Sequence, residues 1–146
     1  MVIRPMTISD YESVYHLWLE TPNMGLNNLD DGQAGFEKYM KRNPNTCFVA
    51  TSGAEVIGVI LCGHDGRRGY IHHTAVKKSS QKCGIGKALV KKALSALEQE
   101  GIHKAALVVF KENANGNSFW DKQGFILRND LNYRNKVITK MIRIDT

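Results

Sequence analysis

The sequence predicts an α/β fold of the α+β type, with a mixed, largely antiparallel central sheet and helices on both of its faces. Two observations support this prediction. Segments with the character of strands are interleaved with segments whose apolar residues recur at helical spacing. Three consecutive strand-like segments in the middle of the chain are joined by short turns, as in an antiparallel meander. The elements follow the order β-α-α-β-β-β-α-β-α-β-β, in a single domain that covers residues 1–146.

The N-terminal part of the chain is predicted to form one strand and two helices. Residues 2–6 are a short apolar run typical of a first strand. Ser9 and Glu12 have the spacing of a capping box, which marks the start of a helix. Residues 21–32 are rich in turn formers and are expected to form a loop. A second short helix ends at Pro44, because the residue before a proline avoids helical geometry.

The middle of the chain is predicted to form three antiparallel strands. The first two, residues 46–51 and 56–62, are joined by a tight turn that contains Gly53. A second turn, within residues 65–69, leads into a strand at residues 70–76.

The last part of the chain is predicted to alternate helices and strands. A loop leads into a long helix that ends at Gly101, a residue suited to a helix C-terminus. Residues 104–110 form a nearly continuous apolar run, as in a strand buried on both faces. A helix at residues 114–122 follows. Residues 125–131 and 136–144 are expected to pair as two strands, which could support a homodimer.

Composition narrows the class of protein. No apolar run approaches the ~20 residues of a membrane span, and the N-terminus lacks the apolar stretch of a secretory signal. We therefore expect a cytoplasmic protein that does not bind membranes. The cysteines Cys47, Cys62 and Cys83 are odd in number and widely spaced, which predicts neither a disulfide framework nor a metal site.

The formal net charge is +6, and much of the excess lies in one short stretch. A basic surface attracts nucleic acids, anionic membranes or phosphorylated ligands, although lysines on a helix are often simply solvated. The sequence contains no recognised nucleic-acid-binding motif, so we expect no nucleic-acid partner. The clustered lysines are Lys77, Lys78, Lys82, Lys87, Lys91 and Lys92.

A glycine-containing turn, residues 81–88, follows a predicted strand and opens a predicted helix. Gly84 and Gly86 allow left-handed backbone and close approach of a ligand. The first amides of a helix have no internal acceptors, and the helix dipole adds positive character there. With Lys82 and Lys87 beside it, this turn is suited to a phosphate or pyrophosphate. The spacing fits neither the P-loop nor the dinucleotide motif, and a glycine pair can also simply punctuate a helix.

Motifs around this turn make the chain resemble the GNAT superfamily of N-acetyltransferases. A strand ends in T-A-V, the motif Q-x-x-G-x-G-K-A-L follows, and N-x-x-x-x-x-F-W-x-x-x-G-F comes after the next strand. The resemblance extends along nearly the whole chain and implies acetyl-CoA as co-substrate. It implies that the loop at Gln81 and the main-chain amides beyond it hold the coenzyme A pyrophosphate. Those amides belong to Lys82, Cys83, Gly84, Ile85, Gly86, Lys87 and Ala88.

The same resemblance implies further contacts with the co-substrate. The strand before the turn is expected to splay from its neighbour and to pair its backbone with the pantetheine arm at Thr74, Ala75 and Val76. Asn113 matches an asparagine that contacts the pantetheine or the acceptor in the family, and Asn117 is a nearby second candidate.

One position departs from the family pattern. Many members carry a tyrosine four residues before the G-F pair, as general acid to the leaving thiolate, and this chain has Trp120 there. An indole cannot supply that proton at neutral pH. A thiol with a pKa of ~8.5 already leaves well as a thiolate. Trp120 is therefore expected to shape the acyl pocket, or to be a core aromatic.

The acceptor amine needs a base, because an alkylammonium has a pKa near ~10.4. The strand at 70–76 offers His72 and His73, and alternation predicts that they lie on opposite faces. In the family the base often sits on this strand, on the face of His72. We therefore expect His72 to be the base unless it is a structural histidine, with His73 as a second choice and Tyr70 to orient water.

The predicted activity is direct transfer of an acetyl group from acetyl-CoA to a primary amine in a ternary complex. The acceptor is a peptide, protein or small-molecule amine, and the alternative is a non-catalytic acyl-CoA sensor. Glu20, Asp30 and Asp31 flank the loop that lines the acceptor site in the family, where carboxylates would favour a cation. Asp30 or Asp31 could equally cap a helix.

Overall fold

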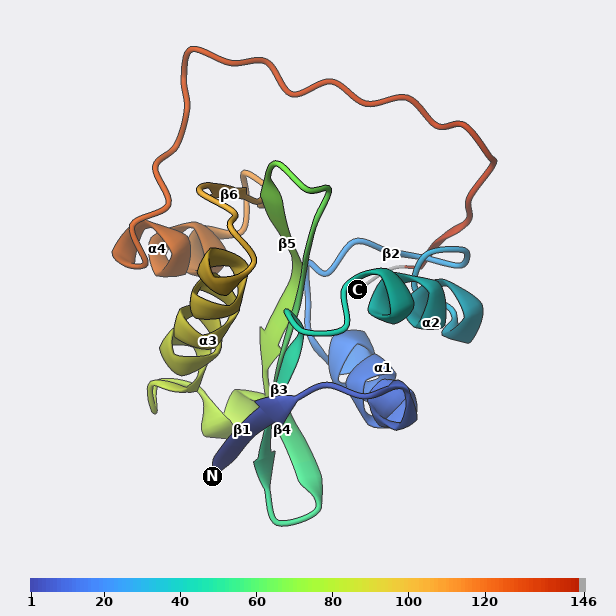
Figure 1. Cartoon of the computed structure of the whole chain (residues 1–146), viewed down its shortest axis with the longest axis vertical. Coiled ribbons are helices and arrows are strands. Elements are labelled where there is room, and N and C mark those ends of the chain that lie inside the picture. Colours follow the sequence, from blue (N-terminus) through green and yellow to red (C-terminus); the bar gives the residue numbers. More distant parts are fainter. Residues whose placement is uncertain (145–146) are drawn as a thin grey trace.

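A five-stranded sheet organises the computed structural model, which describes residues 1–144 (Figure 1). The strands follow the order β1-β3-β4-β5-β6, and every neighbouring pair is antiparallel except β5 and β6, which are parallel. The predicted mixed, largely antiparallel sheet is therefore confirmed. Its strands are β1 (Val2–Pro5), β3 (Phe48–Ser52), β4 (Glu55–His64), β5 (Gly69–Val76) and β6 (Ala105–Ala106).

Helices cover both faces of this sheet, as predicted. Figure 1 shows α1 (Tyr11–Glu20) and α2 (Gln33–Arg42) on one side, with α3 (Ile85–Gln99) and α4 (Ala114–Lys122) on the other. Two short 3₁₀ turns, η1 (Ile8–Asp10) and η2 (Lys78–Ser80), precede α1 and α3. No helix in the described part of the chain combines the length and the apolar composition needed to cross a bilayer.

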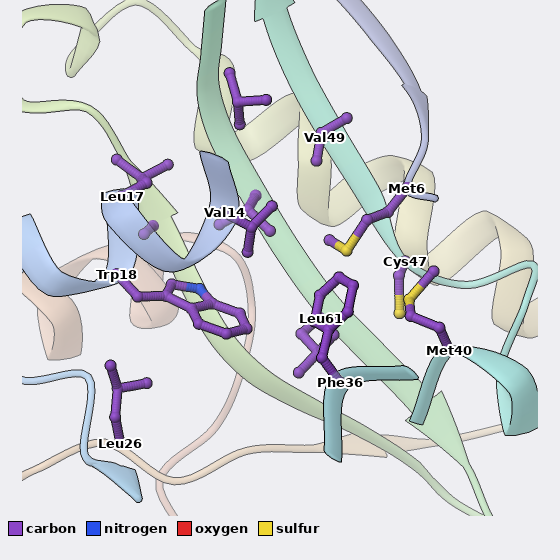
Figure 2. Close-up of a cluster of buried hydrophobic side chains, with 13 residues drawn as sticks. Met6, Val14, Leu17, Trp18, Leu26, Phe36, Met40, Cys47, Val49 and Leu61 are labelled. Carbon is purple, nitrogen blue, oxygen red and sulfur yellow. The ribbon is translucent and has the colours of Figure 1, made fainter. Parts of the chain in front are cut away.

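Each helical layer buries its own apolar core against the sheet. Trp18 of α1 and Phe36 of α2 are almost fully buried in the first core, where their rings meet edge to face (Figure 2). The second core lies under α3, whose buried face includes Leu89 and Ala93. Burial of apolar area at ~25 cal/mol per Å² makes these cores the main source of stability.

A bulge interrupts the pairing of β4 with β5. Val59 pairs with Ala75 and Leu61 with His72, so one residue of β4 lies opposite both His73 and Thr74. His73 takes a left-handed backbone conformation there, with φ of 38°. The bulge inverts the alternation of side chains along the rest of β5.

The other edge of β5 is open over most of its length. Its parallel pairing with β6 is limited to Gly69 with Ala105 and Tyr70 with Ala106. Among the described residues, no strand pairs with this edge from Ile71 to Val76. The expected splay is therefore present, but the predicted strand at 104–110 is wrong in extent, because its residues turn away after Ala106.

The predicted C-terminal strand pair is also wrong. Residues 125–142 contain no strand and arch from α4 to the side of α2, over one end of the sheet (Figure 1). The two-residue strand β6 offers them too short an edge for pairing. Only β7 (Arg143–Ile144) pairs, and its partner is β2 (Leu26–Asn27), within the segment expected to be a loop.

Two further hydrogen bonds extend the contact between β2 and β7. The amide of Asn28 donates to the carbonyl of Ile142 at 3.0 Å, and the amide of Ile142 donates to Asn28 Oδ1 at 2.6 Å. The end of the described chain is thus fastened to the segment that precedes α2.

Candidate active site

A large open cleft, about 2360 Å³, follows the open edge of β5. Residues of β5 from Tyr70 to Val76 line it, as do Gln81, Lys82 and Gly84 of the glycine turn. The segment before α2, the start of α4, residues 106–110 and parts of the arch at 133–141 also line it. The structure therefore brings together the strand, the turn and the two histidines that the sequence singled out.

The glycine turn presents a row of unpaired amides. Lys82 and Gly84 both have left-handed backbone, with φ of 62° and 80°, and Gly84 is the N-cap of α3. The amides from Lys82 to Lys87 have no acceptor within residues 1–144. The amide of Ala88 donates to the carbonyl of Gly84 at 3.0 Å. Ala88 was expected in the cradle, but its amide is already occupied, so the free row ends at Lys87.

The two glycines of this turn are needed for different reasons. A Cβ at Gly84 would meet no atom within 4 Å, so its left-handed φ is what favours glycine there. A Cβ at Gly86 would lie 3.0 Å from the ring of Phe119, so this glycine allows α4 to approach α3. Gln81 fastens the turn to the strand, because its Nε2 donates to the carbonyl of Val76 at 3.0 Å.

The lysines of the basic stretch do not act together. Lys78, Lys82 and Lys87 line the cleft beside the free amides. Lys77 instead forms an ion pair with Glu55. The exposed Cys83 has its thiol near the carbonyl of Gln81 and does not line the cleft.

The two candidate asparagines are held by helix-capping bonds. Asn113 is the N-cap of α4, and its Oδ1 accepts from the amide of Gly116 at 2.9 Å. The amide group of Asn117 donates to the carbonyls of Phe110 and Asn113. Asn113 lines the cleft and Asn117 does not, so Asn113 is the better placed of the two.

Trp120 packs as an aromatic of the second core and also borders the cleft. Its ring meets those of Phe119 and Phe125 edge to face, at centroid distances of 4.9 and 5.1 Å. Trp120 is thus a core aromatic at the edge of the cleft, and its role in shaping the acyl pocket stays a prediction. Tyr133, which the sequence did not single out, also lines the cleft. Burial, with Tyr133 as a second cause, raises the pKa of Tyr70.

The expectation that His72 and His73 lie on opposite faces is wrong. Both line the same cleft, with ring centroids 6.0 Å apart, because the bulge at His73 breaks the alternation. The ring of His72 borders the open cleft beside Tyr39 and Tyr70. His72 is exposed to the cleft, but the protein around its ring still disfavours the cationic form and lowers the pKa of His72 to about 4, with His73 as a second cause.

His73 is fixed by two residues that are distant in sequence. Its Nε2 lies 2.8 Å from Oδ1 of Asp31, whose side chain is only 4% exposed. The indole Nε1 of Trp18 donates to the carbonyl of His73 at 3.0 Å. Asp31 is therefore neither a free carboxylate in the cleft nor the cap of α2, whose N-cap is Gly32. No local sequence signal connects these residues.

Two buried hydroxyls in the cleft wall lack partners in the described part of the chain. They are Oγ1 of Thr74, on the open strand, and Oη of Tyr39, on α2. Buried polar groups are normally hydrogen-bonded, so each orphan marks a place where a ligand could supply a partner. Thr74 lies next to Ala75 and Val76, where the pantetheine arm was expected. Residues 1–144 contain no group of three or more side chains arranged to hold a metal ion.

Comparison with known proteins identifies the family to which this architecture belongs. The sequence model of the acetyltransferase (GNAT) family matches residues 11–125. The chain belongs to the GNAT family of acetyltransferases. The predicted family and enzyme class are thereby confirmed, and the general activity of this GNAT acetyltransferase is acetyl transfer from acetyl-CoA.

Individual relatives of this GNAT acetyltransferase agree with the assignment. It is 32% identical over 113 residues to an acetyltransferase of Photorhabdus laumondii, across 77% of this chain and 78% of that protein. It is 34% identical over 95 residues to human N-alpha-acetyltransferase 30, across 61% of this chain but only 26% of that protein. The solved structure of PaiA N-acetyltransferase from Thermoplasma acidophilum in complex with coenzyme A has the same fold. Its TM-score is 0.76 at 20% identity, across 88% of this chain and 91% of that one.

Proposed function

We propose that this protein transfers an acetyl group from acetyl-CoA directly to a primary amine while both substrates are bound. One observation carries the proposal: the open edge of β5 runs from the free amides of the glycine turn to the two histidines. A single extended ligand can therefore place its phosphates at one end and its acyl group at the other.

The residues present fit acetyl-CoA as co-substrate. Amides from Lys82 to Lys87 would hold its pyrophosphate, aided by the lysine ammonium groups at the turn. The open edge of β5 would pair with the amides of the pantetheine arm, as an added strand pairs with a sheet edge. The unpartnered hydroxyl of Thr74 would gain a hydrogen bond there. The thioester is the activated form of the acetyl group, and holding it beside the amine supplies most of the expected rate.

The acceptor side supports a positively charged amine. Glu20 and Asp30 border the cleft, and their carboxylates would attract an ammonium group. The amine must lose a proton before it can attack, so a base is needed at this end of the cleft. Human N-alpha-acetyltransferase 30 is a relative named for transfer to α-amines, so peptide N-termini come first in any acceptor screen.

A thiol-release assay over an amine panel tests the proposal. The panel contains peptide N-termini, lysine side chains, polyamines and amino sugars, with the products identified by mass spectrometry. We expect at least one amine to be acetylated, with intersecting initial-rate lines and no acetyl group on Cys83 after incubation with acetyl-CoA alone. Tight binding of acetyl-CoA with no release on any amine would indicate the sensor instead. If calorimetry detects no binding of acetyl-CoA, both the transferase and the sensor function are excluded.

Charge at the turn provides a matched control for the binding step. Lys82→Gln and Lys87→Gln should each weaken acetyl-CoA binding about 3–10-fold, with a smaller dependence on salt. Lys91→Gln and Lys92→Gln, on α3 but outside the cleft lining, should leave binding within about twofold. Equal losses of affinity in all four variants would indicate that the overall charge of the surface, and not the glycine turn, attracts acetyl-CoA.

A further inference from the structure

We propose that His73 is the general base of the acetyl transfer and that Asp31 positions it, an inference that rests on the proposed function. The His73 ring is 16% exposed and lines the cleft, with Nε2 2.8 Å from Asp31 Oδ1. The structure thus contains a histidine–aspartate pair in the wall of the cleft.

The hydrogen bonds of Asp31 fix the tautomer of His73. An ionised carboxylate only accepts, and Oδ2 of Asp31 already accepts from the amide of Asn27 at 2.8 Å. The ring nitrogen bonded to Oδ1 must therefore carry a hydrogen, which places it on Nε2. In the unprotonated ring the lone pair is then on Nδ1, which has no hydrogen-bonding partner within residues 1–144. With Nε2 occupied by Asp31, Nδ1 is the ring atom that can accept a proton.

The backbone at His73 is strained and held by tertiary contacts. A non-glycine residue at φ of 38° is uncommon, and such strain persists where the surrounding structure over-determines it. The indole nitrogen of Trp18 holds the carbonyl, and the two rings meet edge to face at 5.1 Å. Together with the carboxylate, these contacts set both the position and the rotation of the imidazole.

The neighbouring imidazole is less suited to the same task. His72 has no hydrogen-bonding partner in the described part of the chain, so nothing fixes its tautomer. Its low pKa also makes it a weak proton acceptor at neutral pH. The charged or titratable groups in contact with His73 are Asp31, from the segment before α2, and His72 from β5. Trp18 from α1 does not titrate.

The transfer balances with His73 in this role. Nδ1 takes one proton from the alkylammonium, and the freed nitrogen lone pair forms the bond to the thioester carbonyl carbon. The carbon–sulfur bond then breaks and sulfur leaves with the electron pair. The second proton lost by the nitrogen ends on that sulfur, and His73 returns its proton to water.

The test compares His73→Asn, Asp31→Asn and a control, His103→Asn, using an amine that the unmodified protein acetylates. Asparagine tolerates left-handed backbone, so His73→Asn removes the imidazole without adding strain. We expect kcat to fall about 100-fold, with the affinity for acetyl-CoA unchanged within about threefold. His103 is exposed and outside the cleft lining, so its variant should stay within about twofold.

Asp31→Asn tests the positioning role separately. The asparagine carbonyl can keep the bond from Asn27, while its NH₂ group donates to Nε2 of His73 and moves the ring hydrogen to Nδ1. We expect a 10–100-fold loss in kcat, and nitrogen NMR should report the exchanged tautomer. A fluorinated analogue of the acceptor, largely uncharged at neutral pH, should be acetylated by His73→Asn with a much smaller loss, because that amine needs no base.

The outcomes separate this inference from the proposed function. If no amine is acetylated, the proposed function fails and the inference falls with it. The inference alone is overturned if the unmodified protein acetylates an amine and His73→Asn keeps its kcat and its pH profile. It is also overturned if His72→Gln costs more in kcat than His73→Asn, or if the fluorinated amine shows the same loss as the parent.

Discussion

The indole nitrogen of Trp18 lies 3.0 Å from the carbonyl oxygen of His73, and this bond joins the first core to the cleft. Trp18 is fully buried between α1 and the sheet (Figure 2), so a change in that core reaches the strained residue of β5 directly. Packing under α1 and the geometry of the acceptor end of the cleft are therefore linked.

The first prediction concerns Trp18→Phe. The change removes the donor to the carbonyl of His73, and it should lower the free energy of unfolding by about 1–3 kcal/mol, because a buried acceptor loses its partner. It should also lower kcat several-fold while the affinity for acetyl-CoA stays the same. Urea denaturation, initial rates and calorimetry measure the three quantities. Trp120→Phe is the control for stability, because no hydrogen bond of that indole is present in residues 1–144; an equal cost from both would contradict the prediction.

The second prediction uses two glycines at opposite ends of α3. Gly84 and Gly101 both have left-handed φ, 80° and 78°, and a Cβ at either would meet nothing within 4 Å. Alanine at each position should therefore cost a similar amount of stability, about 1–2 kcal/mol. Only Gly84→Ala should weaken acetyl-CoA binding, because only that glycine shapes the row of free amides. Titration calorimetry measures the affinity of both variants for acetyl-CoA. Equal affinities would show that the glycine turn is not part of the binding site.

The third prediction concerns the two unpartnered hydroxyls. Thr74→Val and Tyr39→Phe each remove a buried oxygen that has no hydrogen-bonding partner among the described residues. Both variants should raise the stability of the free protein, by about 1 kcal/mol each. Thr74→Val alone should weaken acetyl-CoA binding about 3–10-fold, the value of one hydrogen bond. Thermal melts with and without acetyl-CoA would show the higher stability of the free Thr74→Val protein and its smaller stabilisation by acetyl-CoA. If Thr74→Val binds acetyl-CoA as tightly as the unmodified protein, the hydrogen bond between Thr74 and acetyl-CoA is excluded.

The fourth prediction concerns the pH dependence of stability. The pKa of His72 is about 4 in the folded protein and ~6.5 in the unfolded chain. Between these two pH values the unfolded state therefore binds more protons than the folded state. The stability that neutral His72 contributes to the folded protein is complete above about pH 6.5 and is lost as the pH falls toward about 4. Nitrogen NMR should find the ring neutral at pH 6. In this window the free energy of unfolding of His72→Gln should depend less on pH than that of the unmodified protein. An NMR titration midpoint near pH 6.5 for the His72 ring would refute the shift.

The local features of the fold and of the co-substrate site could be predicted from sequence. The meander and the amide turn depend on residues close together in the chain, such as Gly84 at the start of α3. The capping box predicted at Ser9 and Glu12 is wrong in position, because the structure forms it two residues earlier, between Thr7 and Asp10. The acceptor end could not be predicted in the same way. His73 is held by Trp18 and Asp31, which are 55 and 42 residues away, and only folding brings them together. The period-2 rule failed at His73 because a bulge inverts the alternation there.

The C-terminal prediction failed for a related reason. Residues 136–144 have the apolar content of a strand, but a strand forms only where another edge accepts it. The two-residue β6 does not provide that edge, whereas the segment at Leu26 and Asn27 pairs with β7. Pattern alone gives no information about which edge is free.

The attachment of β7 to β2 matters for how the protein is handled at the bench. Asn27 lies in β2, and its amide holds the carboxylate that orients His73. Deletion of Arg143 and Ile144 would remove the partner of β2, and we expect it to lower turnover while acetyl-CoA binding is retained. A purification handle is therefore better placed beside β1, an edge strand that pairs with β3 and not with β2 or β7.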